Sequence, residues 1–218
     1  MPPRQVLLGR YCRLEPLDAA KHAKDLVDAY RETDRSSWRY LFSEPFESDS
    51  GCERWLADAA ARQHEIFYAL IDLESEKAVA VMSYMRIDPG HGVIEIGNIH
   101  YSDKYKKTRA ATESMYLLMR HVFEDLGYRR YEWKCDSLNA PSRRAALRLG
   151  FEFEGIFRQH MIVKGLNRDT AWFAIVDKDW PRLRRAYERW LSPDNFGDDG
   201  AQRARLADLI AAEMDRPR

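Results

Sequence analysis

A strand, a basic turn and an amphipathic helix follow one another directly between residues 93 and 126. Residues 93–101 have a strand pattern, and Lys106-Lys107-Thr108-Arg109-Ala110-Ala111 then opens a helix. Apolar side chains recur three and four residues apart from Met115 to Leu126, and Gly127 stands where a left-handed C-cap is expected. The helix must therefore pack on a sheet, with its N-terminus close to the end of a strand.

The basic turn at residues 106–111 predicts a site for an anion. A helix N-terminus carries unsatisfied N–H groups and about half a positive charge, and Lys106, Lys107 and Arg109 add three cations. A pyrophosphate would suit this site. A solvated basic loop has the same composition, so the turn alone does not choose between a ligand site and an ordinary surface.

The remaining patterns predict one α+β domain. Short polar links at residues 74–77 and 164–167 connect pairs of strands and indicate antiparallel hairpins. Asp18 and Asn139 are candidate N-caps of two helices, and Ser48 or Asp49 of a third. Strands are expected at residues 10–17, 66–73, 78–87, 93–101, 130–136, 153–163 and 169–176, and helices at residues 18–33, 52–59, 110–126, 139–149 and 180–191.

Composition and charge narrow the class of protein. Lys plus Arg and Asp plus Glu both number 35, so the formal net charge is zero and nothing favours nucleic acid or an anionic membrane as a partner. No window approaches the ~20 apolar residues that span a bilayer, and the three cysteines have neither metal-ligand nor disulfide spacing. We therefore expect a cytoplasmic protein without a metal site. Its domain should cover residues 1–191, with residues 192–218 as a C-terminal tail.

The order of short motifs along the chain resembles that of the GNAT superfamily of N-acetyltransferases, in particular its ribosomal-protein alanine acetyltransferase-like branch. The matching pieces are Arg13-Leu14-Glu15-Pro16-Leu17, Glu95-Ile96-Gly97, Ala111-Thr112-Glu113, Asn139 with Ser142, Leu149-Gly150-Phe151, Glu154-Gly155, Arg168-Asp169 and Trp180-Pro181. The resemblance implies a GNAT-like fold: a mixed, mostly antiparallel twisted sheet of about seven strands, flanked by helices. Two central strands of this sheet would splay apart to admit coenzyme A.

The same resemblance implies acetyl-CoA as co-substrate. Its pantetheine arm would lie along the edge of the strand at Asn98–Tyr101, and its pyrophosphate on the turn that follows. The implied cofactor-binding residues are Ile99, His100, Tyr101, Lys106, Lys107, Thr108, Arg109, Ala110, Ala111, Thr112, Asn139 and Ser142.

The turn departs from the family's Arg-x-x-Gly-x-Ala pattern. Lys106 replaces the arginine, and Arg109 replaces the glycine that permits a positive φ or a close approach to phosphate. Either the turn takes another path and the side chains of Arg109, Lys106 or Thr108 supply the contacts, or the site has lost coenzyme A. The retained cations favour the first interpretation.

Acetyl transfer to an amine needs a polarised thioester carbonyl, a base and an acid. The resemblance implies Ser142 as the acid, and the other interpretation is an ordinary first-turn serine. Glu95 is the candidate base, although a strand-face carboxylate paired with Arg or Lys explains it equally well. His100 is a second candidate, which strand alternation places on the opposite face from Glu95. Two positions depart from the family, since Ala146 stands where many members have a tyrosine acid and Met161 where the branch has a glutamate base.

The candidate residues for binding the acceptor are aromatic or basic. The family's fold implies that an early loop and the last hairpin roof the acceptor pocket, where aromatic rings could enclose an apolar or peptide-like acceptor. Such rings are more often part of a core. The candidates are Trp38, Tyr40, Phe42, Arg158 and Trp172.

We therefore expect an acetyl-CoA-dependent N-acetyltransferase. It would transfer the acetyl group to a primary amine, of a protein or peptide N-terminus or of a small molecule, by direct attack in a ternary complex. The alternative from a different class is a non-catalytic acyl-CoA or nucleotide sensor on the same fold. Two copies could pair as a homodimer through the exposed edge of the last hairpin.

Overall fold

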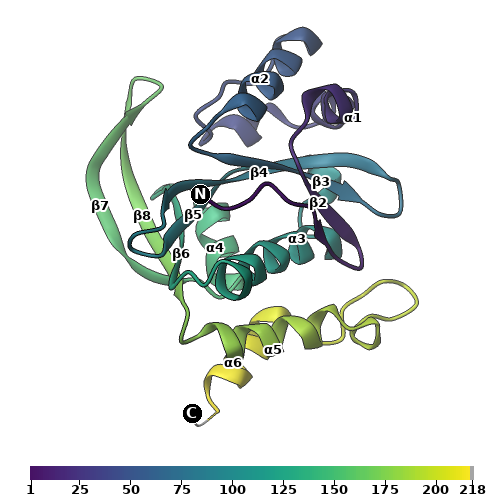
Figure 1. Ribbon diagram of the computed structural model, residues 1–218, viewed down its shortest axis with the longest axis vertical. Helices are drawn as coiled ribbons and strands as arrows, with labels where there is room; N and C mark the ends of the chain where they lie inside the picture. Colours follow the sequence, from purple (N-terminus) through teal and green to yellow (C-terminus); the bar gives the residue numbers. More distant parts are fainter. Residues whose placement is uncertain (217–218) are drawn as a thin grey trace.

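The computed structural model describes residues 1–216, which are built on one eight-stranded sheet (Figure 1). The strand order is β1-β2-β3-β4-β5-β6-β8-β7, and within these residues β5 and β6 form the one parallel pair. The strands are β1 (Leu7–Leu8), β2 (Cys12–Pro16), β3 (Ile66–Asp72), β4 (Lys77–Asp88), β5 (Val93–Tyr101), β6 (Arg130–Asp136), β7 (Glu152–Val163) and β8 (Leu166–Val176). The helices are α1 (Ala19–Arg31), α2 (Asp49–Ala61), α3 (Arg109–Arg120), α4 (Ala140–Arg148), α5 (Trp180–Leu191) and α6 (Leu206–Met214).

The expected α+β class and the mixed, mostly antiparallel sheet are confirmed. The sheet has eight strands where about seven were expected, because β1 has only two residues and is too short to show alternation. Candidate N-caps are confirmed for three helices: Asp18, Ser48 and Asn139 each accept a hydrogen bond from a backbone N–H in the first turn of the following helix. Asp49, the other candidate for α2, is the first residue of that helix. Among residues 1–216, no helix has both the length and the apolar character that crossing a membrane demands.

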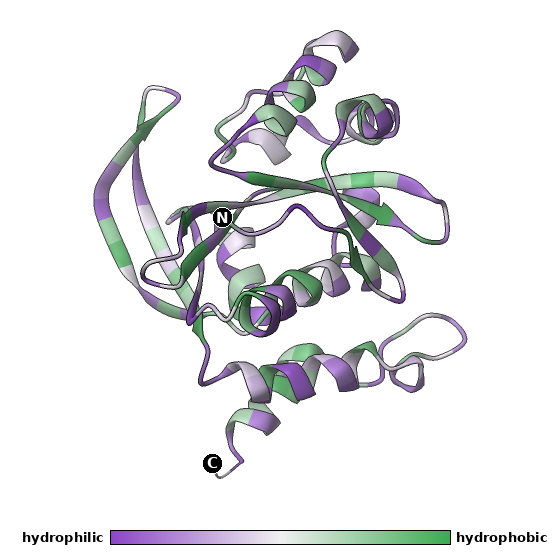
Figure 2. Ribbon diagram, viewed as in Figure 1, coloured by the Kyte–Doolittle hydropathy of each residue, from purple (hydrophilic) through white to green (hydrophobic). Residues whose placement is uncertain are grey.

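Helices cover both faces of the sheet, with α1 and α2 on one face and α3 to α6 on the other (Figure 1). We call these the α1 face and the α3 face. On the α1 face Leu26 packs with Phe67 in one core cluster, and on the α3 face Leu118 packs with Tyr84 in a larger one. Figure 2 shows hydrophobic residues concentrated in the central strands, as burial on both faces requires.

The two central strands diverge, as the resemblance implied. β5 and β6 pair from Val93 opposite Arg130 to Ile96 opposite Trp133, and beyond that point each pairs only with its outer neighbour. Divergence begins beside a bulge in β5, where Asn98 has a φ of 50° and the register with β4 shifts. A bulge bends its strand and interrupts the ladder, so the bend at Asn98 opens the sheet here.

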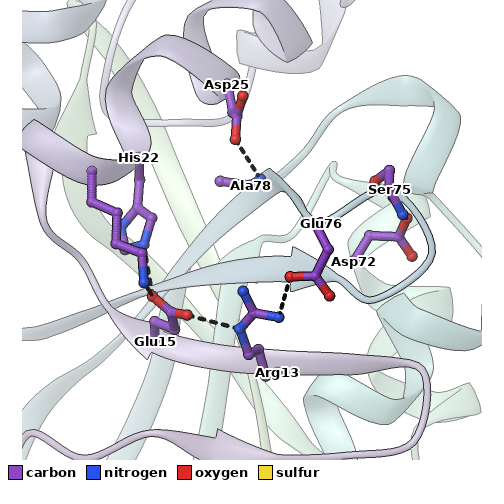
Figure 3. A network of polar contacts seen from close by, with 9 residues as sticks. Arg13, Glu15, His22, Asp25, Asp72, Ser75, Glu76 and Ala78 are labelled. Atoms are coloured by element: carbon purple, nitrogen blue, oxygen red, sulfur yellow. Dashed lines mark hydrogen bonds and ion pairs between the residues drawn. The ribbon is translucent and has the colours of Figure 1, made fainter.

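A buried carboxylate ties β2 to α1 (Figure 3). Glu15 lies 2.8 Å from Arg13 Nε and 3.0 Å from His22 Nε2, and it also pairs with Lys21. Burial acts to raise the pKa of Glu15, but the hydrogen bonds from these three residues outweigh it and lower the pKa to about 2. Arg13 also donates to Glu76 at 2.6 Å, so the same network fixes the turn between β3 and β4.

The segment after α5, expected as a tail, packs against the domain through α6 and several other residues. Leu206 and Leu209 of α6 are buried in the core of the α3 face. Glu213 is 1% exposed and pairs with Arg185 and Arg189 of α5. The position of α6 therefore depends on α5. That the domain ends at residue 191 stays a prediction.

The last hairpin extends beyond the rest of the sheet (Figure 1). Its turn has positive φ at Lys164 (52°) and Gly165 (75°), which matches the right-handed twist of the two strands. β7 is the outermost strand of the sheet on this side. Pairing of two copies through that edge stays a prediction.

Candidate active site

A cavity of 1410 Å³ opens beside the turn that follows β5. It runs between this turn, α4 and the segment after α5, and Tyr101, Met115 and Trp133 line its inner part. Six of the predicted cofactor residues belong to the turn that lines it: Lys106, Lys107, Thr108, Arg109, Ala110 and Ala111. The structure thus brings the basic turn and the diverging strands together around one space.

The turn presents a helix N-terminus to this cavity. Thr108 is the N-cap of α3, and its Oγ1 accepts the N–H of Ala111 at 3.1 Å. The N–H groups of Arg109 and Ala110 belong to the first turn, where a helix supplies no internal acceptor. These donors and the positive end of the helix dipole suit a phosphate.

Arg109 does not need the freedom of the glycine that it replaces. It is the first residue of α3, and the positive φ of the turn falls on Lys107, at 65°. The Arg109 side chain packs against two rings that also line the cavity, with its guanidinium carbon 5.0 Å from the Tyr11 centroid and 4.6 Å from the Phe196 centroid. Aromatic contacts that a glycine could not make therefore hold this turn.

Two arginines of α4 also line the cavity and were missed from the sequence. Arg144 and Arg148 lie four residues apart and therefore on one side of the helix. Arg148 also lies 3.4 Å from Thr112 Oγ1, which joins α4 to α3. The sequence signal that could have identified them is this pair of cations in the helix that Asn139 caps.

The residues around the cavity fit acetyl-CoA. Diverging strands leave an unpaired backbone edge for an amide-bearing arm, and the capped turn with Lys106, Lys107, Arg144 and Arg148 suits its phosphates. Other predicted contacts lie behind this surface. Ile99 is half-buried against the core, Thr112 is buried, and Asn139 serves as the cap of α4.

Ser142 lies next to the inner end of the cavity. Its Oγ accepts the indole N–H of Trp133 at 3.0 Å, and Trp133 lines the cavity. Indole nitrogen is only a donor, so the serine hydroxyl keeps its own hydrogen for another acceptor. Ser142 can therefore donate a proton or hydrogen bond from this position.

A second cavity, of 370 Å³, lies on the α1 face, and Phe42, Asn98 and His100 are among its lining residues. His100 stacks on Tyr30, with 4.1 Å between ring centroids, and meets Trp38 edge-to-face at 4.3 Å. Burial, with a smaller effect of Lys106, lowers the pKa of His100 to about 3, so its ring is neutral near pH 7.

The expected separation of His100 and Glu95 onto opposite faces is wrong. Glu95 pairs with Met85, and His100 with Val81, on alternate positions of β4. The bulge at Asn98 inserts one extra residue between them, which reverses the alternation beyond it. Both side chains therefore lie on the α1 face.

Glu95 is held by two cations. It is 2% exposed, its Oε1 accepts from Arg86 at 2.7 Å, and its Oε2 lies 2.9 Å from Lys134 Nζ. Lys134 is shared with Glu132, at 2.6 Å. This is the arrangement of the paired strand-face carboxylate, which was the alternative to a base.

The predicted acceptor residues occupy different environments. Trp38 is buried against His100, and the Tyr40 hydroxyl donates to the Leu138 carbonyl at 3.2 Å. Phe42 is 50% exposed and lines the second cavity. Arg158 is exposed on β7, while the Trp172 ring lies 3.9 Å from Lys134 Nζ. Only Phe42 of the five lines a cavity described above.

The comparisons with known proteins agree with this architecture. The family model for the acetyltransferase (GNAT) domain matches residues 12–152. A GCN5-related N-acetyltransferase from Brucella melitensis is 48% identical, with a TM-score of 0.94 and 96% of each chain covered. A probable GNAT-family acetyltransferase from Chromobacterium violaceum is 40% identical, with a TM-score of 0.77, and the match covers 83% of this chain and 90% of that one.

A more distant match shows only a shared fold. It is an acetyl transferase from Salmonella typhimurium that modifies the N-terminal serine of a 50S ribosomal subunit protein, with 19% identity, a TM-score of 0.67, and coverage of 79% of this chain and 99% of that one. None of the curated proteins compared with the sequence matches it. The family model and the two closely similar structures show that this chain belongs to the GNAT family of acetyltransferases, as its sequence indicated.

Proposed function

We propose that this protein transfers the acetyl group of acetyl-CoA to a primary amine by direct attack in a ternary complex. The observation that carries this proposal is the divergence of β5 and β6 beside the capped N-terminus of α3, within one cavity of 1410 Å³. Acetyl-CoA supplies the acetyl group as an activated thioester. The turn at residues 106–111 and the arginines of α4 hold its phosphates.

Residues on both sides of the opening between β5 and β6 polarise the thioester, supply a proton and bind the amine. Backbone N–H groups of β5 beyond the bulge at Asn98 polarise the acetyl carbonyl. Ser142 donates its hydroxyl hydrogen to the departing thiolate, with Trp133 fixing its position, and regains a proton from the amine nitrogen, which loses one as the amide forms. The second cavity on the α1 face receives the amine. Neutral His100 and paired Glu95 both lie on that face, and Glu95 acts as a base only if its ion pairs open.

Direct attack is favoured because no cysteine suits a covalent intermediate. Cys12, Cys52 and Cys135 are all buried. Burial raises the pKa of the Cys135 thiol, which lies on the α3 face, and so keeps it protonated and weakly nucleophilic near pH 7.

Binding and turnover separate this function from the alternative of a sensor. Calorimetry with acetyl-CoA, coenzyme A and ATP should show binding that is selective for the first two. Thiol release with a panel of amines and N-terminal peptides should then be faster than without an acceptor. Selective binding without acceptor-dependent release would support a sensor, and the lack of any coenzyme A binding would contradict both functions.

A further inference from the structure

Buried polar atoms without a partner gather on the α1 face. Within residues 1–216, eight buried side-chain nitrogen or oxygen atoms lack a hydrogen-bond partner. Such atoms are rare in folded proteins, and each calls for an explanation. Four of the eight belong to residues whose side chains lie on the α1 face: Trp38 Nε1, His100 Nε2, Arg168 Nε and Trp172 Nε1. A fifth atom on this face, Glu95 Oε2, has Lys134 as its ion-pair partner.

Arg168 carries the one positive charge of this group. It lies in β8 on the same face as Thr170 and Trp172, because alternate strand residues point the same way. Arg168 is 7% exposed, and its guanidinium carbon lies 5.1 Å from the centroid of the Phe42 ring. Among residues 1–216 no carboxylate lies within ion-pair distance of it.

The two basic side chains nearest to Glu95, Arg86 and Lys134, are already paired with carboxylates. Arg86 pairs with Glu95, and Lys134 is shared between Glu95 and Glu132. Burial lowers the pKa of Arg168, and the charge of Asp136 partly opposes this effect. Asp136 acts on Arg168 only from beyond ion-pair distance, and one of its carboxylate oxygens accepts the backbone N–H of Leu138 at 2.8 Å. Arg168 is therefore left as a buried cation without a direct counter-charge, which is costly unless another group supplies one.

We propose that Arg168 binds a carboxylate of the acceptor, so that the amine substrate is an amino acid or a peptide with an acidic group close to the amine. The inference rests on the proposed acetyl transfer. A guanidinium matches the two oxygens and the single charge of a carboxylate. A phosphate ester carries nearly two charges near pH 7, which exceeds the one unmatched cation.

The position of Phe42 connects this charge with the acceptor cavity. Its ring lies over the Arg168 guanidinium and also lines the 370 Å³ cavity that contains Asn98 and His100. An acceptor in that cavity would have its amine near the diverging part of β5 and its carboxylate toward β8. Arg168 is thus a residue that determines specificity, and it takes no part in proton transfer.

Matched product analogues test the proposal without requiring turnover. One pair is N-acetyl-leucine and N-acetyl-leucinamide, and the other is acetyl-Ala-Asp-amide and acetyl-Ala-Asn-amide. Within each pair only the carboxylate differs, and the two pairs distinguish a free amino acid from an acidic peptide. Calorimetry is performed with and without saturating coenzyme A. The wild-type protein should bind the acid of at least one pair roughly tenfold more tightly than its neutral partner, equivalent to about 1.4 kcal/mol.

Variants of Arg168 test whether the preference for the carboxylate analogue depends on this side chain. R168M should lose the preference and R168K should keep part of it, while both bind coenzyme A as the wild type does. R54M is the control, because Arg54 is an exposed arginine of α2 that lines neither cavity. Circular dichroism checks that each variant folds, and R168M should be no less stable than the wild type because it removes an uncompensated buried charge.

Three results would overturn the proposal: equal affinity for both members of both pairs, no binding of any analogue, or a preference that persists in R168M. The wild-type measurement alone can give the first two, so the outcome does not depend on whether R168M folds. Failure to bind coenzyme A would instead contradict the proposed function, and the analogues measured without it would still decide the role of Arg168.

Discussion

The guanidinium carbon of Arg109 lies 4.6 Å from the centroid of the Phe196 ring, and so joins the turn at residues 106–111 to the segment that follows α5. Tyr11 of the β1–β2 connection packs on the same guanidinium at 5.0 Å. Glu113 of α3 holds this connection, since its carboxylate accepts the N–H groups of Arg10, Tyr11 and Cys12. The conformation of the turn therefore depends on two distant parts of the chain.

Replacing Phe196 with Ala should weaken acetyl-CoA binding by roughly two- to tenfold. The change removes one face of a cation–π contact worth about 0.5–1 kcal/mol at an exposed site, and it leaves Arg109 free to move. Calorimetric titration with acetyl-CoA measures the effect. Phe157→Ala is the matched control, because this ring is 56% exposed on β7. An unchanged dissociation constant in Phe196→Ala would show that the contact does not shape the turn.

Ser142→Ala should lower kcat roughly 10- to 100-fold and leave the affinity for acetyl-CoA nearly unchanged. The hydroxyl would act on the departing thiolate during the reaction, and a positioned general acid contributes at least this much. Thiol-release assays at saturating acetyl-CoA measure kcat. Ser142→Thr retains a hydroxyl and should keep most of the activity. Equal loss in both variants would point to packing around Trp133 in place of proton donation.

Glu15→Gln should destabilise the protein near pH 7 by up to about 3 kcal/mol, since each unit of pKa shift is worth about 1.4 kcal/mol. The pKa of Glu15 is lowered in the folded state, to about 2. The stabilisation is therefore complete above the ordinary glutamate pKa and is lost as the pH falls from about 4.5 toward 2. Urea unfolding of both proteins at several pH values measures the difference.

The exposed Glu53→Gln on α2 provides the control for this experiment, because Glu53 makes no ion pair with residues 1–216. Its free energy of unfolding should match that of the wild type at each pH. If the difference between Glu15→Gln and the wild type stayed constant with pH, the network of Figure 3 would not depend on the charge of Glu15.

Lys134→Met should cost about 1–3 kcal/mol of unfolding free energy. The side chain of Lys134 is 6% exposed between Glu95 and Glu132, and its removal leaves two adjacent buried carboxylates that keep one arginine each, Arg86 and Arg130. Denaturant unfolding measures the loss. Lys24→Met replaces an exposed lysine of α1 and should leave stability within about 0.5 kcal/mol of the wild type. A mild effect at Lys134 would mean that water compensates the two acids.

Local periodicity allowed most of the fold to be predicted from sequence. β5 and α5 begin and end at the expected residues, 93–101 and 180–191, because their burial patterns are strong and their ends carry clear turn signals. α3 begins at Arg109, one residue before the expected start. Motif order was sufficient to identify the family, since that information is spread along the chain.

The site was less accessible to sequence reasoning. Nothing in the pattern of β5 marks Asn98 as a bulge, because a positive φ at asparagine leaves no trace in alternating hydrophobicity. One extra residue then changes the face of every side chain that follows. Arg109 contacts Phe196, and Arg168 contacts Phe42. The partners in both pairs lie far apart in the sequence, and a local sequence pattern cannot predict such contacts.

Gln202 and Gly200 line the same cavity as Lys106, so one side of this cavity forms late during synthesis. During synthesis the basic turn leaves the ribosome long before residues 196–202, which form this side of the cavity. Until residues 196–202 emerge and Asn195 closes its hydrogen bonds to Trp190 and Ala204, the cavity is open on one side. The growing chain can therefore fold its sheet early, but it completes the wall of this cavity only after residues 196–202 have been made.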